Sequence, residues 1–403
     1  MKKGVHIVTI LIMLLPLLSG CWNQKELTEL AFVMAMGIDK GKDNKFKVSF
    51  QLVNPGNVTA GQGGAGGGQG LPIAVYRSTG DTLTEAARKA TKKVSRRLYY
   101  AHTNLVVISE KVAKEDLLYI LDAFDRDPEF RTTTEMVVAR GSTAEQIVTT
   151  LTILDRLPVN KITKQIKASE GLLGENMAVN IDEFLIGLVS KGKEPILNGY
   201  RLIGIKSKAR EAENLQKTTT DAYLASDGLA IFKDGKLHGW MSNNDARGVV
   251  WIQDKVKSTD IYIDWKKKKK ALVVAPIRSK TKVSVQFINQ KPIINIKIDS
   301  EGWVSEANTA IDLNNPDVIG QIDVLAEKEI KRQILHSVKA SQKLKTDILG
   351  FGDKVHISNP KLWKKYQGNW DEEFASLKVN VSVDFYVRRE GIRTIPFWST
   401  MEK

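Results

Sequence analysis

Apolar and polar residues in the first half of the chain follow two kinds of spacing. Uninterrupted apolar runs, or strict alternation of apolar and polar residues, predict strands at 31–38, 45–53, 105–109 and 135–139. The first two are expected to form an antiparallel pair. Apolar residues at helical spacing predict helices at 81–98, at 114–125 and within 141–190. Asp81, Ser142 and Asp182 precede these helical patterns and are the expected N-caps.

The second half is richer in strand patterns. Strands are predicted at 228–232, 237–241, 261–265, 271–274, 282–288, 293–298 and 377–388. Asp234-Gly235 between the first two predicts a hairpin turn, because glycine accepts a positive φ without steric strain. One helix of roughly 50 Å is predicted at 317–349, where apolar residues recur every fourth position, and Gly350 and Gly352 are expected to end it.

This mixture of strands and helices, without a regular repeat, predicts a multidomain α+β protein with mixed and antiparallel sheets and packed helices. The polar segment 206–221 is the expected linker between an N-terminal α+β region, 21–205, and a C-terminal α+β domain, 222–395. The N-terminal region has room for two subdomains. Eight of the fifteen residues at 56–70 are glycine, which predicts a flexible loop. No Gly-Lys-Ser/Thr follows, so a phosphate-binding loop is not supported.

Cys21 is the only cysteine in 403 residues, and it directly follows an apolar segment that ends in Leu18-Ser19-Gly20. Two lysines and a short apolar core precede it, as in a lipoprotein signal peptide at 1–20. That core is too short to cross a bilayer, which needs roughly 20 apolar residues. We expect cleavage before Cys21 and a diacylglycerol on its sulfur, which gives stable membrane anchoring. A secretory signal with a chance cysteine, or a signal anchor, is the alternative.

Charge and cysteine content limit the possible partners. The chain carries a net charge of +14, which falls to +12 when the two lysines of the signal peptide are removed. An exported basic protein is attracted to phospholipid head groups and cell-wall polymers, whereas nucleic acid is not an expected partner. With its one thiol carrying lipid, the chain has no cysteine left for a disulfide or a metal cluster.

The sequence contains no motif that indicates catalysis, and no metal or cofactor is expected. The four histidines after Cys21 are widely separated and show no metal-binding spacing: His102, His238, His336 and His356. No Gly-X-Ser-X-Gly elbow occurs. A carboxylate pair for glycoside hydrolysis stays open, because such a pair is defined by distance in space.

Two charged segments are candidate contact sites. In the first, Arg126, Asp127, Glu129 and Arg131 surround Pro128, which favours a turn that leaves a helix, with the arginines pairing to nearby carboxylates. A partner contact is the alternative for this segment. The second consists of Lys266, Lys267, Lys268, Lys269 and Lys270. A solvated hairpin tip that blocks edge pairing is favoured there, and an electrostatic contact with anionic lipid or wall polymer is the alternative.

Several short segments occur in a distinctive order over nearly the whole chain after the signal peptide. They are Cys21-Trp22, Glu26-Leu27, Gly37-Ile38-Asp39-Lys40, 82–86, Arg97-Leu98-Tyr99, His102, 126–131, 228–232, Lys236-Leu237, Gly239-Trp240, Pro360, Trp363, Trp370 and Arg388-Arg389-Glu390-Gly391. In these features the chain resembles the Ger(x)C family of spore germination lipoproteins, the C subunits of nutrient germinant receptors. The glycine-rich and lysine-rich segments depart from the family pattern, both where loops are expected.

The resemblance implies a non-enzymatic subunit of three α+β domains on the outer face of the spore inner membrane. It would work beside two integral-membrane subunits, one of which binds the nutrient, so no small-molecule ligand is expected on this subunit. The resemblance supplies no catalytic residues. A solute-binding lipoprotein of a transporter and a wall-active hydrolase are the rival functions. The first requires two similar α/β lobes, which the strand-rich second half disfavours.

Overall fold

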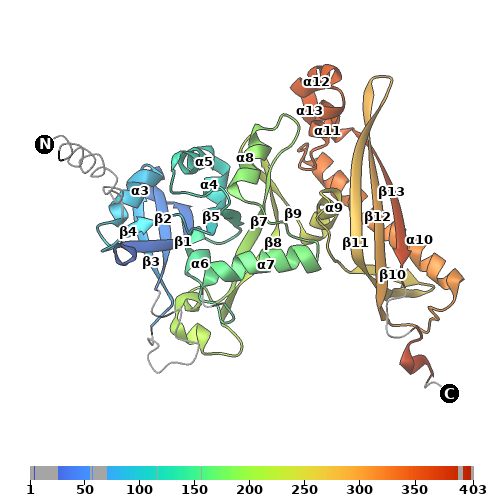
Figure 1. Cartoon of the computed structure of the whole chain (residues 1–403), viewed down its shortest axis with the longest axis horizontal. Helices are drawn as coiled ribbons and strands as arrows, with labels where there is room; N and C mark the ends of the chain where they lie inside the picture. The colour runs from blue at the N-terminus through green and yellow to red at the C-terminus, as the bar shows by residue number, and fades with distance from the viewer. Residues whose placement is uncertain are drawn as a thin grey trace.

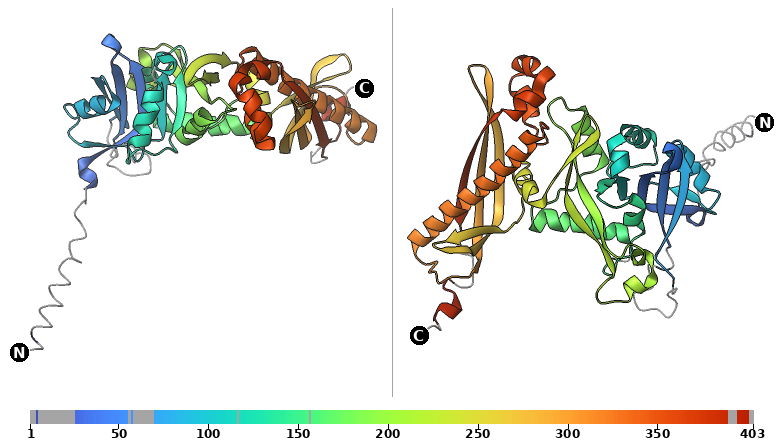
Figure 2. Two further views of the ribbon diagram at one scale, coloured as in Figure 1. Left: turned by 90° about the horizontal axis from the view of Figure 1, so that it is seen from above. Right: turned by 180° about the vertical axis from the view of Figure 1, so that it is seen from behind.

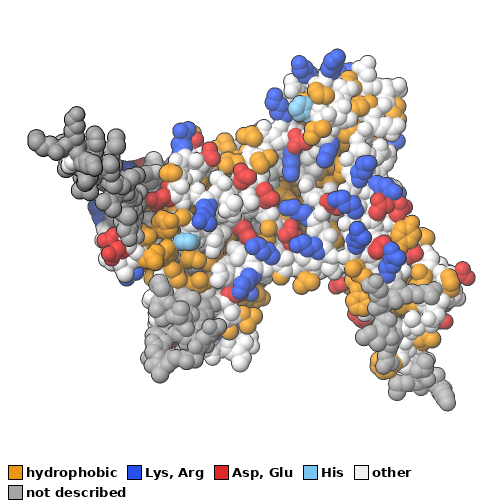
Figure 3. Space-filling view, in the orientation of Figure 1, with side chains coloured by type: hydrophobic (Ala, Val, Ile, Leu, Met, Phe, Trp, Pro, Cys, Tyr) orange, Lys and Arg blue, Asp and Glu red, His pale blue; other side chains and the backbone are white. Residues whose placement is uncertain are grey.

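The computed structural model describes residues 26–54, 70–115, 117–155, 157–388 and 394–400, together with Gly4 and Asn57. This part of the chain contains a nine-stranded and a four-stranded sheet, which lie side by side in an elongated molecule (Figure 1). On the face seen in Figure 3, basic and acidic side chains are mixed over the surface. Cys21 and most of the glycine-rich segment 56–70 lie outside the described residues.

The larger sheet has mixed strand directions, and β5 and β6 lie at its centre. Its strands are β1 (Leu30–Lys40), β2 (Phe46–Val53), β3 (Ile73–Gly80), β4 (Arg97–Tyr99), β5 (Leu105–Ser109), β6 (Glu135–Ala139), β7 (Ile196–Gly204), β8 (Ala222–Lys233) and β9 (Lys236–Met241). Their order is β3-β2-β1-β5-β6-β7-β8-β9, and β4 pairs with the start of β1. β1 and β2 are antiparallel, as predicted, whereas β1, β5, β6 and β7 run parallel.

Helices cover both faces of this sheet, so its central strands are buried on both sides. Within β1, Met36 and Ile38 join one apolar core, while Ala35 joins the core on the opposite face. The first face carries α3 (Leu83–Ala90), α4 (Glu110–Glu115), α5 (Leu117–Arg126) and α8 (Ile181–Val189). The second carries α6 (Ala144–Thr149) and α7 (Pro158–Leu172), as Figures 1 and 2 show. This two-sided burial explains why these strands read as continuous apolar runs.

Three predicted N-caps are wrong by one or two positions. The residues that cap α3, α6 and α8 are Thr82, Thr143 and Asn180. Each side-chain oxygen accepts the backbone N–H three residues later, at 3.1, 3.0 and 2.8 Å. Asp81 and Ser142 directly precede the true caps, Asp182 lies in the first turn of α8, and Ser142 instead accepts the backbone N–H of Leu202.

Two of the predicted helices have different bounds. The helix expected at 81–98 ends at Ala90, and 97–99 form β4, because these residues pair in parallel with 30–32 of β1. The helix expected at 114–125 is replaced by the two shorter helices α4 and α5. Tertiary strand pairing overrides local helical spacing at the first of these positions.

The polar segment 206–221 connects β7 and β8, which are antiparallel neighbours in the larger sheet. It contains two short 3-10 helices, η4 (Lys208–Arg210) and η5 (Ala212–Leu215). Asn214 is buried and exchanges hydrogen bonds with the backbone of Ala222. The segment is therefore packed against the sheet, and its role as a domain linker stays a prediction.

The hairpin predicted at Asp234-Gly235 is confirmed. Asp234 has φ of 50° and Gly235 has φ of 74°, so both central residues adopt the left-handed conformation of a type I′ turn. After β9, α9 (Asn243–Ile252) leads to the second sheet.

The second sheet has the order β10-β11-β12-β13. Its strands are β10 (Ile261–Trp265), β11 (Lys268–Ile288), β12 (Lys291–Ala307) and β13 (Lys378–Val387). The strands predicted separately at 271–274 and 282–288 are parts of the single strand β11. One face of the sheet packs against α10 (Pro316–Lys343), whose predicted apolar stripe is buried from Ile322 to Val338.

Three short helices follow: α11 (Phe351–Ser358), α12 (Pro360–Tyr366) and α13 (Trp370–Ala375). The remaining 3-10 helices are η2 (Leu27–Glu29), η3 (Lys42–Asn44), η6 (Gln367–Asn369) and η7 (Phe397–Thr400).

The long helix ends at Lys343 and not near 349 as predicted. Gly350 has φ of 75° and starts α11 instead of ending α10. Between the two helices, the buried carboxylate of Asp347 accepts the backbone N–H of Gly350 at 2.9 Å and of Gly352 at 2.8 Å, and the indole N–H of Trp370 at 2.9 Å. A side chain that satisfies the first amides of α11 thus fixes where the helical segment is broken.

The predicted α+β class, with mixed and antiparallel sheets and packed helices, is confirmed. The two sheets differ in size, strand order and helix cover. They do not form the pair of similar α/β lobes that the solute-binding alternative requires.

Candidate functional site

One face of α3 lines a cavity in the N-terminal region. Thr84, Ala87, Arg88 and Thr91 follow the spacing i, i+3, i+4, i+7, which places them on one side of the helix. Ala86 and Ala90 on the opposite side are fully buried in the core. The Thr82 cap and the pairing of Lys89 with Glu85 support this short helix.

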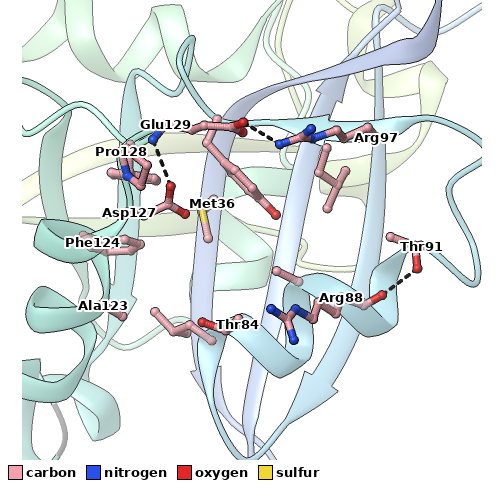
Figure 4. A pocket seen from close by; sticks show the side chains of 15 residues that line it. Met36, Thr84, Arg88, Thr91, Arg97, Ala123, Phe124, Asp127, Pro128 and Glu129 are labelled. Atoms are coloured by element: carbon pink, nitrogen blue, oxygen red, sulfur yellow. Dashed lines mark hydrogen bonds and ion pairs between the residues drawn. The ribbon is translucent and has the colours of Figure 1, made fainter. Parts of the chain in front are cut away.

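The cavity lies between the middle of β1, α3, the segment formed by β4 and Tyr100, and the end of α5 with the turn that follows it, and it has a volume of about 490 Å³ (Figure 4). Its remaining wall consists of Met36, Leu83, Arg97, Leu98, Tyr100, Ala123, Phe124, Asp127, Pro128, Glu129 and Phe130. Phe124 and Phe130 stack with ring centroids 4.2 Å apart. The site therefore joins four segments that are distant in sequence, and each includes residues on which the family resemblance rests.

The turn at 127–130 confirms the predicted turn that leaves a helix. The Asp127 carboxylate accepts the backbone N–H of Glu129 at 2.9 Å, and the Asp127 carbonyl accepts that of Phe130 at 3.0 Å. These bonds place Phe130 in the wall of the cavity and Glu129 at its rim. The charged residues of this turn are thus also cavity residues.

The rim carries an ion pair that the sequence did not predict. The guanidinium of Arg97 lies 2.5 Å from the Glu129 carboxylate, and it links β4 to the turn across 32 positions. The Glu129 side chain is 27% exposed and that of Arg97 is 52% exposed. The pair holds the turn in place over the cavity, although an exposed ion pair of this kind contributes little to overall stability.

Two further groups give the cavity hydrogen-bonding capacity. Burial raises the pKa of the Tyr100 hydroxyl well above its ordinary value, and the charges of Asp127 and Glu129 raise it further, so the phenol stays a neutral donor. Arg88 lies on the α3 side, across the cavity from Asp127 (Figure 4). Among the interactions between described residues, none involves the Arg88 guanidinium.

The side chains of this cavity are suited to binding a ligand. Its side chains are apolar groups, hydroxyls, two guanidinium groups and two carboxylates, and both carboxylates are engaged by hydrogen bonds or an ion pair. Within the described ranges, no group of three or more histidine, cysteine, aspartate or glutamate side chains is arranged to hold a metal ion.

The other predicted residues of the turn lie away from the cavity. Arg126 pairs with Asp122 one turn earlier on α5, at 2.8 Å, and not with a carboxylate of its own cluster. Arg131 is exposed beyond the turn. Of the four predicted contact residues here, the cavity brings together Asp127 and Glu129 only.

The lysine run lies at the tip of the β10–β11 hairpin, as predicted, in the second sheet and far from the cavity in sequence: Lys266 and Lys267 form the turn, and the other three lysines begin β11. All five lysines are exposed, and Lys266 and Lys270 have positive φ. Lys268 binds Asn308, and the Lys270 ammonium lies 5.2 Å from the Tyr262 ring centroid. Lys270 also borders a separate polar cavity of about 640 Å³ beside α10.

Sequence reasoning missed Arg88, Tyr100 and the role of Arg97 in the rim. Arg88 is detectable in principle, because the apolar stripe of α3 leaves Thr84, Ala87, Arg88 and Thr91 together on another face. The pairing of Arg97 with Glu129 depends on β4 lying beside β1, which local spacing does not reveal.

Comparison with known proteins defines the class of this molecule. The family described as "Spore germination protein N-terminal domain" matches residues 23–202, and the family described as "Spore germination B3/ GerAC like, C-terminal" matches residues 227–391. These matches identify a spore germination protein. The chain belongs to the Ger(x)C family, as its motifs predicted.

Individual relatives agree over the whole length. Spore germination protein KC of Bacillus subtilis (strain 168) is 40% identical over 399 residues, which cover 98% of each chain. Spore germination protein B3 of the same organism is 25% identical over 97% of this chain and 99% of its own. The crystal structure of the GerBC protein matches with a TM-score of 0.53 and 18% identity, over 91% of this chain and 99% of that one, and so shares the fold.

None of these descriptions names a catalytic activity. Across the described segments, no helix has both the length and the apolar character that a bilayer crossing requires.

Proposed function

We propose that this chain is the lipid-anchored, non-enzymatic C subunit of a spore nutrient germinant receptor. It would be held by Cys21 on the outer face of the spore inner membrane, where it assembles with two integral-membrane subunits and is needed for the response to small nutrients. The observation that carries this proposal is family membership over the full length of the chain, combined with a cysteine directly after a short apolar leader.

The tether has a physical role in this proposal. Two acyl chains hold a protein stably at a membrane, where a single chain would dissociate. Confinement to the membrane surface raises the effective concentration of the body near its partner subunits. Modest contacts are then sufficient to assemble the receptor.

The test replaces Cys21 with Ala in spores. The Cys21→Ala protein should leave the membrane fraction, and germination in nutrient should be strongly impaired, while germination by a stimulus that bypasses nutrient receptors stays normal. Lys339→Ala, at an exposed position of α10 outside the candidate contact sites, is the control and should behave as the wild type. Normal nutrient germination with Cys21→Ala would contradict the proposal.

Assembly is tested by purifying the tagged lipoprotein from spore membranes. We expect two multi-span membrane proteins of one receptor set to copurify with it. Recovery of a transporter permease or of peptidoglycan fragments would instead support one of the rival functions.

A further inference from the structure

We propose that the cavity between α3 and α5 binds a small organic anion with an apolar body, whose negative group lies at Arg88 and whose body lies against the aromatic wall. This site goes beyond the proposed receptor role. It also replaces the expectation, based on the family resemblance, that this subunit has no small-molecule ligand.

The wall of the cavity is built to contact an apolar body. Met36 and Phe124 are each 4% exposed, and Phe130 is 7% exposed, so these side chains are fixed by packing. The Phe124 and Phe130 rings are nearly parallel, with 14° between their planes. Ala87 adds a small side chain on α3, which leaves space in front of the rings. A volume of about 490 Å³ falls in the range of roughly 300–1,000 Å³ that is usual for small-ligand pockets.

The charges at the rim select an anion. Arg97 and Glu129 neutralise each other in an ion pair, and the Asp127 carboxylate accepts a hydrogen bond from its own turn. Arg88 also lies on the cavity wall, and its guanidinium takes part in neither of these contacts. A guanidinium presents several N–H donors in a planar fork that matches a carboxylate or a related oxyanion. The charge of Asp127 across the cavity disfavours a second negative group, so we expect a monoanion.

Neutral donors complete the site. Tyr100 lines the cavity, and the centroid of its ring lies 6.4 Å from those of Phe50 and Phe130. Thr84 contributes another hydroxyl from the same helix face as Arg88. A few polar groups that converge on an apolar cavity are typical of a small-ligand site. A protein partner would require about 800 Å² on this chain, more than one concave pocket supplies.

The test uses the purified mature chain with Cys21→Ser and two fluorescent probes of matched shape. The first probe, 8-anilinonaphthalene-1-sulfonate, combines an aromatic body with one negative charge. The second, N-phenyl-1-naphthylamine, has the same aromatic body without the charge. We expect saturable binding of the anionic probe at one site per chain, measured by fluorescence titration. No membrane or receptor partner is involved, so this test is independent of the proposed function.

Three variants locate the probe. Arg88→Gln should weaken the anionic probe about tenfold or more and leave the neutral probe within about twofold, because only the first loses a charge-assisted contact. Ala87→Leu fills the cavity and should weaken both probes at least tenfold. Arg126→Gln removes an exposed arginine on the neighbouring helix that does not line the cavity, and should change neither.

Circular dichroism melting shows whether each variant is folded. The proposal is overturned if the folded wild type shows no saturable binding of the anionic probe. It is also overturned if Ala87→Leu binds both probes with unchanged affinity, because the probes then bind outside this cavity. Equal effects of Arg88→Gln on the two probes overturn the assignment of the anion to Arg88.

Discussion

The contact between Gly192 and Gly352 gives a sharp test of how the two halves of the molecule are joined. Gly192 lies between α8 and β7 of the larger sheet, and Gly352 lies in the first turn of α11. The carbonyl of Gly192 accepts the backbone N–H of Asp353 at 3.1 Å, and the Ser190 hydroxyl donates to the Asp353 carboxylate at 2.6 Å. The backbones approach so closely that neither glycine has room for a side chain.

The structure gives the expected size of the effect of Gly192→Ala. The added Cβ would lie 2.5 Å from the backbone nitrogen of Asp353, whereas ordinary contacts lie at 3.4–4 Å. The obstacle is backbone, so the loop or α11 must move by about 1 Å. Overpacking of this kind costs about 1–3 kcal/mol, and weakening the two hydrogen bonds adds about 0.5–1.5 kcal/mol for each. We therefore expect a loss of about 2–6 kcal/mol in the free energy of unfolding.

Urea denaturation of the unlipidated mature chain measures this loss, with tryptophan fluorescence as the signal because Trp370 lies beside Gly352. Gly320→Ala is the matched control. Its Cβ would meet nothing within 4 Å, in the interior of α10, so it should stabilise the protein by about 0.5–1 kcal/mol. If Gly192→Ala proves as stable as the wild type, the close backbone contact does not hold in solution and the reasoning is refuted.

Three further predictions concern buried and exposed charges. Burial raises the pKa of Glu194 to about 7, so the folded protein keeps a proton that the unfolded chain releases from about pH 4.5. The free energy of unfolding therefore falls as the pH rises through this window. Glu194→Gln should remove about 1–3 kcal/mol of that loss, measured by urea denaturation at pH 5 and pH 8. The Asp39 carboxylate accepts the backbone N–H groups of Ala144 and Glu145 at the start of α6, both at 2.8 Å. Asp39→Asn should lower the free energy of unfolding by about 1–3 kcal/mol, because one of these donors then loses its acceptor. Replacing the exposed Lys267 with Gln should change the free energy of unfolding by less than about 0.5 kcal/mol, and a larger change would contradict the solvated hairpin tip.

The strands were predictable because burial imposes a simple pattern on them. The run at 31–38 is apolar throughout because β1 is covered on both faces, and the Asp234-Gly235 turn follows from the conformations that a two-residue hairpin requires. Helix ends were less predictable. Adjacent positions such as Asp81 and Thr82 carry residues that are both able to cap, and only the path of the backbone decides which of them reaches the third amide of the helix.

The candidate site was only partly predictable from the sequence. The charged turn at 125–131 stood out by its order of residues, but its partner Arg97 lies 32 positions before Glu129. Sequence spacing suggested that Arg126 pairs within its own cluster, whereas the helix places Asp122 directly beneath it at the i−4 position. Contacts that depend on which strands are neighbours cannot be read from local spacing.

The two interpretations of the charged turn, a capped turn and a contact site, are compatible. Hydrogen bonding through Asp127 and the ion pair of Glu129 give the turn its shape, and the same bonds place Phe130 against Phe124 in the cavity wall. Because both carboxylates are engaged in holding this geometry, they are poorly placed to recognise a partner by themselves. Recognition must then rest on groups that the turn leaves unengaged, and on α3 that group is Arg88. The turn acts as a rigid support for a site whose selectivity comes from the opposite wall.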